Sequence, residues 1–269
     1  MIRRIISIIK RDGIRFFLVK LIAKILAVDI NIIQSFKREV WSILREKHNH
    51  KVAYGPFKGL SLPKKLWWGD DRITQTLGIY EEHVLSQLIE NSQQGATKLI
   101  DVGAADGYFA IGLIFSKIYQ KSIAFEISQE GQNRILENAK RNQCEDRIEI
   151  HGEATLESLT AALSGPQKST VLIDIEGSEY DLLNDDVLEA LSSSFIICEL
   201  HHNLINNGLA REQDLLKRAS KYFETRLIKR ETYNPNTFPE LDHLGDLQRL
   251  IAVSESRTKN TRWLVCSPL

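Results

Sequence analysis

The sequence predicts an α/β protein built on a Rossmann-like, doubly wound, mostly parallel seven-stranded sheet, with an α-helical N-terminal extension. From residue 98 onward, short and nearly continuous apolar stretches alternate with helical stretches. This alternation is typical of a parallel sheet that helices cover on both faces. Before residue 48, apolar side chains instead recur at helical spacing among many lysines and arginines, which predicts helices without a sheet.

Each expected strand is a short apolar run bounded by turn-forming residues. We expect strands at residues 98–103, 122–127, 147–154, 169–177, 194–202, 224–233 and 262–268. Helical periodicity after the first five strands predicts helices at residues 108–118, 131–142, 155–163, 178–191 and 211–223. A polar insertion at residues 234–260 precedes the last strand, and the topology places it where a lid would cover a pocket.

Several elements precede the sheet. Apolar residues at helical spacing predict helices at residues 2–12, 14–28, 30–47 and 78–91. Between the last two helices, residues 52–63 contain two glycines and two prolines among short apolar pieces. This composition predicts a hairpin or an irregular β segment.

The zero net charge, from 35 Lys+Arg and 35 Asp+Glu, hides an uneven division. Residues 1–51 carry 12 basic and 4 acidic side chains, a net of +8, and the other 218 residues carry 23 and 31, a net of −8. Such asymmetry is typical of an interaction element attached to a separate domain. We therefore divide the chain into a basic amphipathic helical extension (1–51), a β or irregular segment with an approach helix (52–97), and the α/β domain (98–269).

The basic front end, residues 1–28, has three interpretations. The first is a peripheral membrane anchor, in which cationic side chains contact anionic head groups. The second is a helix for dimerisation or for packing on the protein's own core. The third is a contact with nucleic acid. Bulky branched apolar side chains favour lipid or protein over phosphate, and the acidic remainder of the chain repels a phosphate backbone. We therefore expect no nucleic-acid partner, and we leave membrane contact, a homodimer and packing on the core open.

Sequence features also indicate a compartment. Charged residues interrupt every N-terminal apolar stretch before it reaches the length of a signal peptide or a membrane span. The three cysteines are widely spaced, and they form neither a disulfide framework nor a zinc site. We expect a cytoplasmic protein. Under the anchor interpretation, residues 1–28 would attach it peripherally to the inner face of the membrane.

Ligands of an open parallel sheet bind beyond the carboxyl ends of its strands. The first strand ends in DVGAADG, where Gly103 and Gly107 permit a tight turn and close backbone approach to a ligand. The G-x-x-x-G spacing differs from the G-x-G-x-x-G of dinucleotide sites, which favours a ligand without a pyrophosphate. Glu126 ends the second strand, where a carboxylate can accept hydrogen bonds from both hydroxyls of a ribose.

Here the chain resembles a known family. DVGAADGYFAIGL, followed by FEIS at the second strand end, resembles a class I S-adenosylmethionine-dependent methyltransferase. LIDIEGSEYDLL at the fourth strand resembles the D-x-E-G-x-E signature of FkbM-type methyltransferases, and IICELH resembles the E-x-H that ends their fifth strand. LGIYEEHVL resembles their G-x-Y-E approach helix. The resemblance covers roughly residues 76–203, with a weaker likeness at WLVCSP.

The resemblance implies S-adenosyl-L-methionine as the cofactor. The residues that it assigns to cofactor binding are Glu81, Asp101, Gly103, Ala104, Gly107, Glu126, Glu153, Ala154 and Asp174. The glycine loop and Glu81 would face the methionine end, Glu126 would hold the ribose, and Glu153 and Ala154 would flank the adenine. The family often has a lysine two positions before the signature aspartate. That position is Leu172 here, so any role of that lysine is absent or filled by another residue.

Methyl transfer to a hydroxyl requires that the hydroxyl lose its proton. Asp174 and Glu176 are two apart on an expected strand, so their side chains point to the same side, and Glu199 and His201 repeat this spacing. We interpret these four as catalytic. His201 is the general base, since its ordinary pKa is near neutrality, and Asp174 is the second choice or orients the acceptor. The same four could also hold a divalent cation, but no coordination geometry follows from the sequence and we assign no metal.

Glu179 lies in the first turn of the helix expected at residues 178–191. A carboxylate is favourable there because of the helix dipole alone. The sequence therefore leaves open whether Glu179 has a structural or a functional role.

The predicted function is methylation by S-adenosyl-L-methionine, with a hydroxyl of a small molecule or glycan as the acceptor. Two alternatives stay open. One is N-methylation of a small amine or peptide, which needs less help from a base, and the other is a catalytically silent cofactor-binding fold that serves as a membrane-associated assembly factor. The acceptor depends on a pocket expected between residues 52–75 and 234–260, where no motif identifies it.

Overall fold

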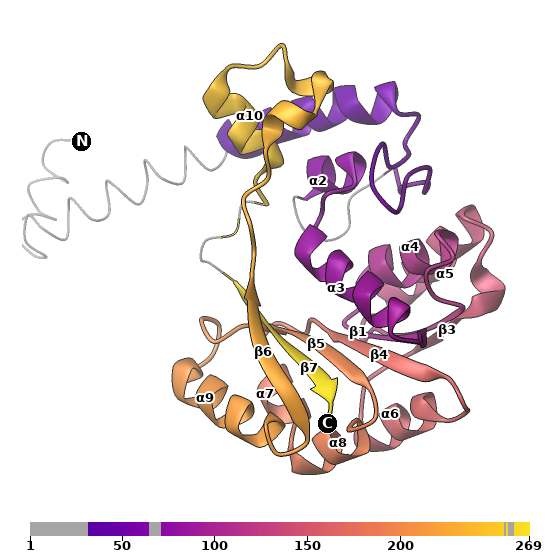
Figure 1. Ribbon diagram of the computed structural model, residues 1–269. Coiled ribbons are helices and arrows are strands. Elements are labelled where there is room, and N and C mark those ends of the chain that lie inside the picture. Colours follow the sequence, from indigo (N-terminus) through magenta and orange to yellow (C-terminus); the bar gives the residue numbers. More distant parts are fainter. Residues whose placement is uncertain (1–31, 65–70, 256, 258–260) are drawn as a thin grey trace, which may run out of the picture.

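The computed structural model describes residues 32–64, 71–255, 257 and 261–269 (Figure 1). Within them a seven-stranded sheet has the order β3-β2-β1-β4-β5-β7-β6. The first five strands pair in parallel, and β7 runs antiparallel to both β5 and β6. The predicted α/β fold with a mostly parallel seven-stranded sheet is confirmed. The strands are β1 (Ala96–Val102), β2 (Lys121–Phe125), β3 (Ile148–His151), β4 (Lys168–Ile173), β5 (Phe195–Leu200), β6 (Phe223–Lys229) and β7 (Arg262–Pro268).

Helices cover both faces of this sheet, as the doubly wound arrangement requires (Figure 1). One face carries α3, α4 and α5, and the other carries α6 to α9. A further helix spans residues 32–47. The labelled helices are α2 (Arg72–Leu77), α3 (Glu82–Gln93), α4 (Tyr108–Phe115), α5 (Gln129–Arg141), α6 (Leu156–Leu163), α7 (Glu179–Leu182), α8 (Asp185–Ala190), α9 (Gly208–Ala219) and α10 (Asp246–Val253).

The strand order creates a switch point between β1 and β4. From β1 the chain moves outward through β2 and β3, whereas from β4 it moves in the opposite direction to β5. At such a point the connections leave in opposite directions and open a crevice at the carboxyl ends of the strands. Val102 pairs with Ile173 at this end of the sheet. The loops that begin at Gly103 and Asp174 are therefore direct neighbours.

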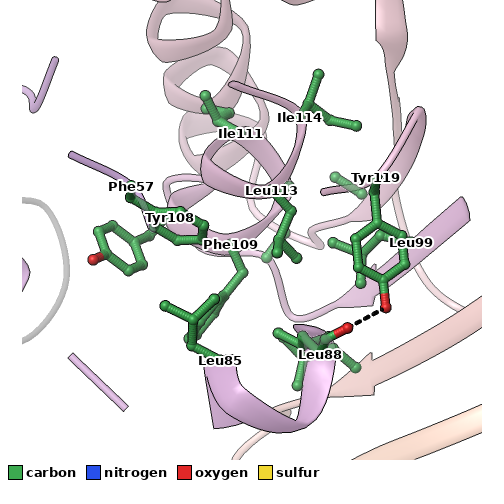
Figure 2. Packing of buried hydrophobic residues seen from close by; sticks show 14 of the residues in the cluster. Phe57, Leu85, Leu88, Leu99, Tyr108, Phe109, Ile111, Leu113, Ile114 and Tyr119 are labelled. Carbon is green, nitrogen blue, oxygen red and sulfur yellow. Dashed lines mark hydrogen bonds between the residues drawn. The ribbon is translucent and has the colours of Figure 1, made fainter. Parts of the chain in front are cut away.

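The face of the sheet that carries α3 and α4 is densely packed (Figure 2). Leu99 of β1, Leu88 of α3 and Leu113 of α4 are completely buried there. The hydroxyl of Tyr119 donates a hydrogen bond of 2.9 Å to the carbonyl oxygen of Leu88, so its polar end is satisfied inside the core. Burial of each such aliphatic side chain stabilises the fold by about 1.5–3 kcal/mol. This packing gives β1 and the loop after it a rigid support.

The irregular segment before α2 rests on α4. It holds a single antiparallel bridge between Lys51 and Ser61, in keeping with the predicted hairpin or irregular β segment. The ring of Phe57 is buried against Gly112, where a Cβ atom would come within 2.4 Å of the ring. Gly112 therefore makes room for Phe57, and the contact fixes the segment beside α4.

A third hydrophobic cluster lies beyond the two that cover the faces of the sheet, above the carboxyl ends of the parallel strands (Figure 1). It joins the helix at residues 32–47 through Leu44, α2 through Ile73, and the polar insertion through Phe238 and Val253. The insertion is thus packed against an N-terminal helix. This places it at the end of the sheet where the predicted lid would lie.

Several predicted boundaries are wrong. The third strand ends at His151 and not at residue 154, and the sixth ends at Lys229 and not at residue 233. Three other differences have a clear local reason. β4 ends at Ile173, not at residue 177, because Glu176 and Gly177 have the left-handed φ values of 51° and 108° that a strand cannot contain. The helix expected at residues 178–191 is divided into α7 and α8, because the side chain of Asn184 accepts the N–H of Val187 and begins a new helix.

The approach helix expected at residues 78–91 instead spans Glu82–Gln93, as α3. Gly78 has a φ of 79° and ends α2, and Glu81 has a φ of 46°, so no helix runs through either residue. A Cβ atom on Gly78 would lie 2.1 Å from the carbonyl oxygen of Tyr54, which explains why glycine occupies this turn.

Some predictions lie outside the described residues. These are the helices at residues 2–12 and 14–28, and with them the membrane, dimer and packing interpretations of residues 1–28. Among the helices of the described ranges, none combines the length and the apolar character needed to cross a membrane. The division of the chain at residues 51 and 97 stays a prediction.

Candidate functional site

A cavity of about 1090 Å³ opens at the switch point, beyond the carboxyl ends of the central strands. Its volume is slightly above the range of about 300–1,000 Å³ that is usual for small-molecule sites. Most predicted site residues line it: Glu81, Asp101, Gly103, Ala104, Glu126, Glu153, Ala154, Asp174, Glu176 and Glu199. Gly107 and His201 are predicted site residues that do not belong to this lining.

The loop after β1 approaches the loop after β4 closely. Gly103 has a φ of 88°, and a Cβ atom there would lie 1.9 Å from the carbonyl oxygen of Asp174. Both the backbone conformation and the space therefore require glycine at this position. The result is a bare stretch of backbone on the cavity wall, as the sequence predicts for a close approach to a ligand.

Glu126 holds this loop from the side of β2. Its Oε2 accepts a hydrogen bond of 3.0 Å from the N–H of Ala105, and its Oε1 accepts one of 2.8 Å from the N–H of Ser128. Each carboxylate oxygen can accept a second hydrogen bond. The side chain is mostly buried yet lines the cavity, so it can bind a diol without rearrangement.

Gly107, unlike Gly103, does not belong to the cavity lining. It precedes α4 with a φ of 85°, and a Cβ atom there would come within 2.8 Å of the side chain of Ile111. Gly107 therefore turns the chain into α4, and its role in cofactor binding stays a prediction. The carbonyl of the preceding Asp106 accepts a hydrogen bond of 2.8 Å from the Asn138 side chain, which anchors the turn.

Asp101 is nearly completely buried at the end of β1. Burial, reinforced by the charge of Asp174, raises the pKa of Asp101 to about 7, although a hydrogen bond with the backbone of Ala110 opposes the shift. Asp101 therefore changes charge near neutral pH. A nearby positive charge would favour its anionic form.

The residues predicted to flank an adenine follow β3. This strand ends at His151, so Glu153 and Ala154 lie in the loop after it and not at its end. Both line the cavity, on the side that also carries Glu126. The ring of His151 stacks on Phe125 with centroids 5.3 Å apart, which supports this wall from behind.

His201 faces a group of carboxylates at the ends of β4 and β5. Its Nε2 lies 3.5 Å from Oδ1 of Asp174, 3.6 Å from Oε2 of Glu176 and 3.6 Å from Oε1 of Glu199. The four residues predicted to be catalytic are therefore together. The reason given for Asp174 and Glu176 was wrong, because both follow the end of β4 and a turn, not strand alternation, brings them to one side.

The carboxylates shift the protonation of this group. Burial by itself would lower the pKa of His201, but the contact with Glu179 and the charges of Asp174 and Glu176 raise it above the ordinary value. Burial raises the pKa of Asp174, against the opposing charge of His201. The histidine is thus a stronger base than a free imidazole, and a proton on it is stabilised from several sides.

Asp174, Glu176 and His201 also meet the first requirement of a cation site. One ligand atom from each lies within 4.8 Å of the other two. Carboxylate oxygens with an imidazole nitrogen suit several divalent cations. The cation alternative noted from the sequence is therefore compatible with the geometry, and removal of divalent cations separates it experimentally from proton transfer.

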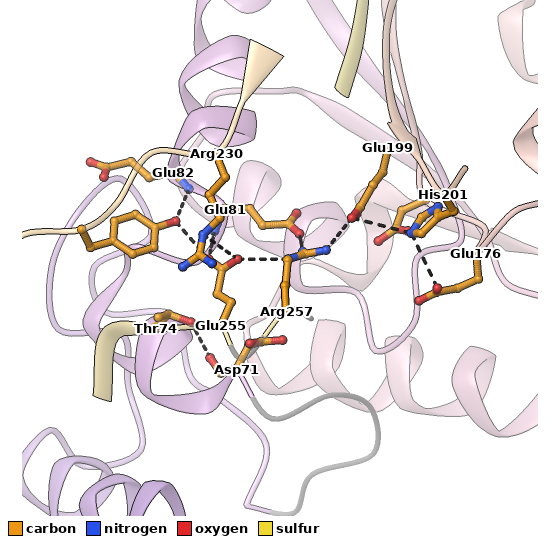
Figure 3. A network of polar contacts seen from close by, with 12 residues as sticks. Asp71, Thr74, Glu81, Glu82, Glu176, Glu199, His201, Arg230, Glu255 and Arg257 are labelled. Atoms are coloured by element: carbon orange, nitrogen blue, oxygen red, sulfur yellow. Dashed lines mark hydrogen bonds and ion pairs between the residues drawn. The ribbon is translucent and has the colours of Figure 1, made fainter. Parts of the chain in front are cut away.

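Arg257 is a residue that sequence reasoning missed. Figure 3 shows it in a chain of polar contacts that runs from Glu255 to the carboxylates of the site. Its guanidinium forms ion pairs with Glu81 and Glu199, lies 3.3 Å from Glu255, and stands over the ring of Trp263 at 5.6 Å. Arg257 therefore connects the end of the insertion to β5 and to the turn before α3.

The acids around Arg257 are themselves strongly shifted. Burial, opposed by the charge of Arg257, raises the pKa of Glu81 to about 8. Burial and the charge of Asp174 raise the pKa of Glu199 well above its ordinary value. No sequence signal distinguishes Arg257 from the other basic residues of the insertion, because its partners are far away in the chain.

Glu179, which the sequence left open, is completely buried between the site's two loops. Its oxygens accept hydrogen bonds from the backbone N–H groups of Gly177 and His201. The side chain of Ser178, by contrast, caps nothing. Glu179 is thus joined to the site and does more than begin a helix.

Comparisons with known proteins were made for the whole chain. No protein-family model matches it, and a search of curated proteins finds no match. Among solved structures, cofactor-bound Rv0187 from MTB is similar, with 12% identity and a TM-score of 0.49 over 69% of this chain and 79% of that one.

Two further solved structures are similar at the same level. The O-methyltransferase from Bacillus cereus in complex with SAH has 14% identity and a TM-score of 0.46, over 87% of this chain and 91% of that one. The precorrin-6y C5,15-methyltransferase from Geobacter metallireducens GS-15 has 12% identity and a TM-score of 0.46, over 70% and 88%. The fold of this chain is defined by its own strand order. The antiparallel β7 lies between β5 and β6, and this order is that of the class I methyltransferase fold.

Proposed function

We propose that this protein is an S-adenosylmethionine-dependent methyltransferase of the FkbM type that methylates a hydroxyl of a small molecule or glycan. One observation carries the proposal. A single cavity is lined by a bare glycine loop, by Glu126 and by the carboxylates of Asp174, Glu176 and Glu199, which lie 3.5–3.6 Å from Nε2 of the histidine behind them, His201. The first part suits a nucleoside cofactor, and the second suits removal of a proton.

The residues present fit S-adenosylmethionine. Glu126 keeps an accepting position on each oxygen for the two ribose hydroxyls, and Glu153 and Ala154 border the space for the adenine. The ionisable Asp101 and Glu81 line the part of the cavity next to the glycine loop, where an ammonium group would be stabilised. When bound, the cofactor supplies an electrophilic methyl group on a sulfonium.

The acceptor hydroxyl has to lose its proton as its oxygen attacks. We assign the acceptance of this proton to Nε2 of His201, and we assign the orientation of the hydroxyl to Asp174, which lines the cavity. The surrounding carboxylates stabilise the imidazolium that forms. A positioned general base of this kind contributes about 10²–10⁴-fold to the rate.

The insertion forms the cover of the cavity in this proposal. Arg257 lines the cavity and pairs with Glu81 and Glu199, so it holds the end of the insertion over the acceptor side. A closed cover excludes water from the transferring methyl group. The acceptor would enter between this cover and the segment before α2.

A second candidate is N-methylation of a small amine or peptide. It is favoured by the carboxylates Glu81, Asp174, Glu176 and Glu199 in the cavity lining, which attract a cationic amine. An amine also needs less assistance from a base than a hydroxyl does. The two candidates differ in the atom that receives the methyl group, so the product distinguishes them.

Calorimetry and product analysis test the proposal together. The protein should bind S-adenosylmethionine, and Glu126→Ala should weaken the affinity at least about tenfold, since two hydrogen bonds to a carboxylate are lost. Glu149→Ala is the matched control, because Glu149 is an exposed acid on neighbouring β3 that does not line the cavity. Mass spectrometry of products made from methyl-labelled cofactor with extracts of the source organism should then show label on an oxygen. A wild-type protein without measurable cofactor affinity would refute the proposal.

A further inference from the structure

Glu179 at the start of α7 is completely enclosed by protein. Its Oε2 accepts a hydrogen bond of 2.8 Å from the backbone N–H of Gly177. Its Oε1 accepts one of 2.7 Å from the backbone N–H of His201. One side chain therefore ties the loop after β4 to the end of β5, on the side of His201 away from the carboxylates of the cavity lining.

This enclosed carboxyl group is ionised. Burial would raise the pKa of Glu179, but the nearby ring of His201 and the hydrogen bond from its backbone N–H outweigh that effect and hold the pKa below its ordinary value. α7 has only four residues, so its dipole is small, and the partners that stabilise the charge lie in other segments. The structure thus places a fixed negative charge beside one histidine.

The two nitrogens of His201 have different surroundings. Nδ1 lies 3.4 Å from Oε1 of Glu179, whereas Nε2 faces Asp174, Glu176 and Glu199 at 3.5–3.6 Å. The contact at Nδ1 is longer than an ordinary N–H···O hydrogen bond of about 3.0 Å. Catalytic hydrogen bonds are often long without substrate and shorten in the complex.

We propose that Glu179 is a positioning residue: it keeps the proton of neutral His201 on Nδ1 and so leaves the lone pair of Nε2 directed at the acceptor side. A carboxylate only accepts hydrogen bonds, so each nitrogen of the ring has an acid that favours a proton on it. Glu179 prevails because it is fully enclosed and makes the shortest contact, whereas solvent screens the acids Asp174 and Glu176. The charge of Glu199 is balanced by Arg257. Carboxylates orient catalytic histidines in this way in other enzymes. The step at Nε2 rests on the proposed function, whereas the position of the proton on Nδ1 is a property of the protein alone.

The proton balance of the reaction follows from this arrangement. As the bond from the acceptor oxygen to the methyl group forms, its O–H bond breaks and the proton binds Nε2. His201 is then an imidazolium that lies between Glu179 on one side and Asp174 on the other. Glu179 itself gains no proton, and its charge balances that of the ring.

None of the other acids around His201 can replace Glu179. Asp174 and Glu176 are partly exposed, and they lie on the Nε2 side. Glu199 is also on that side, and it is paired with Arg257. Glu179 is therefore the one acid among the described residues that contacts Nδ1.

Nitrogen NMR of the wild-type protein tests the tautomer without any substrate. With ¹⁵N-labelled histidine, and His201→Asn to assign the signal, the neutral ring of His201 should carry its proton on Nδ1. A neutral ring that carries its proton on Nε2 would overturn the inference. Since the measurement needs no turnover, it stands even if the protein transfers no methyl group, and it separates failure of this inference from failure of the proposed function.

Kinetics of Glu179→Gln test the consequence. We expect kcat to fall at least about tenfold, with the KM of the acceptor and the affinity for the cofactor nearly unchanged. The acid limb of the pH–rate profile should move to lower pH, because loss of an adjacent negative charge makes the imidazolium easier to deprotonate. Glu179→Asp, which keeps the charge, should recover part of this shift.

Glu212→Gln is the matched control. Glu212 is also buried, and its Oε2 lies 3.1 Å from Nδ1 of the neighbouring His202, a histidine with no part in the proposed proton transfer. This variant should cost a similar amount of stability and leave the pH–rate profile unchanged. An unshifted profile in Glu179→Gln, or equal shifts in both variants, would reduce Glu179 to a structural role.

Discussion

Nε2 of His201 lies 3.5 Å from Oδ1 of Asp174, at the point where the loop after β4 meets the end of β5. The pKa of His201 is lowered by burial but raised further by Glu179, Asp174 and Glu176, so the net shift is upward from the ordinary value. A general base works only in its unprotonated form. The rate of methyl transfer should therefore decline, as pH falls, at a higher pH than a free histidine with a pKa of about 6.5 would give.

The first prediction concerns removal of this base. His201→Ala should lower turnover about 10²–10⁴-fold while cofactor affinity, measured by calorimetry, stays within a few-fold of the wild type. His202→Ala is the control, since the acid that His202 contacts, Glu212, does not line the cavity, whereas the acids at Nε2 of His201 do. Equal losses of turnover and affinity would indicate a structural role. Loss of wild-type activity on removal of divalent cations would instead favour a metal held by the same cluster.

The second prediction concerns the glycine loop. Gly103→Ala should lower the melting temperature and abolish cofactor binding, because a Cβ atom would lie 1.9 Å from the carbonyl oxygen of Asp174 and the backbone has a φ of 88°. Gly95→Ala separates the two causes. Gly95 has a similar φ of 96° but has no atom within 4 Å of an added Cβ, so it should cost only the conformational strain of about 1–2 kcal/mol. Calorimetry that finds the two variants equally stable would contradict the close approach.

The third prediction concerns stability and pH. Burial raises the pKa of Asp101 to about 7 in the folded protein, whereas the unfolded chain has the ordinary value near 4. The folded state then binds more protons, so this group stabilises the fold at low pH and the contribution is lost as pH rises through 7. Asp101→Asn should flatten the fall in the free energy of unfolding between pH 4 and 7. Asp146→Asn, at an exposed acid, should leave that slope unchanged.

The fourth prediction concerns Arg257. Arg257→Ala should lower the melting temperature and raise the pKa values of Glu81 and Glu199 further, because its positive charge now lowers both. Hydrogen exchange in α10 should accelerate as the insertion loses its attachment to β5. Arg249→Ala is the control, because Arg249 pairs with the exposed Asp246 on the surface of α10, where an ion pair contributes about 0–1 kcal/mol. Unchanged exchange in α10 would show that Arg257 does not hold the insertion.

The fifth prediction concerns residues 1–28. If these basic and apolar residues attach the protein to a membrane, deletion of residues 1–28 should abolish sedimentation with anionic liposomes. The deletion should leave cofactor affinity unchanged, since the cavity is lined by residues from 71 onward. Full-length protein that never sediments with such liposomes would exclude the membrane interpretation.

The cofactor side of the cavity was largely predictable from the sequence. Gly103 and Glu126 lie directly after two buried strands, and parallel strands bring their carboxyl ends together whatever the details of the packing. Local pattern is enough in such a case. Gly107 shows the limit of this reasoning, because a glycine after a strand can either approach a ligand or turn the chain into a helix. Only the structure shows that a Cβ atom at Gly107 would come too close to Ile111 of α4.

The sequence predicted which carboxylates would surround His201, but not the geometry that brings them there. Asp174 and Glu176 reach His201 through a left-handed turn at Glu176, although strand alternation was the expected cause. A residue other than glycine in that conformation gives no signal in the sequence. Arg257 also has no recognisable signal in the sequence, because its ion pairs with Glu81 and Glu199 depend on how distant segments meet.

By itself the sequence determined the α/β class, the seven strands, the order of helices and strands, and the loops where a ligand would bind. These follow from hydrophobic periodicity and from the conformational freedom of glycine, which are properties of neighbouring residues. The tertiary structure alone decided that Glu179 faces Nδ1 of His201, and that Arg257 pairs with both Glu81 and Glu199. Those relationships depend on burial and on charges brought together from separate segments, which no local pattern encodes.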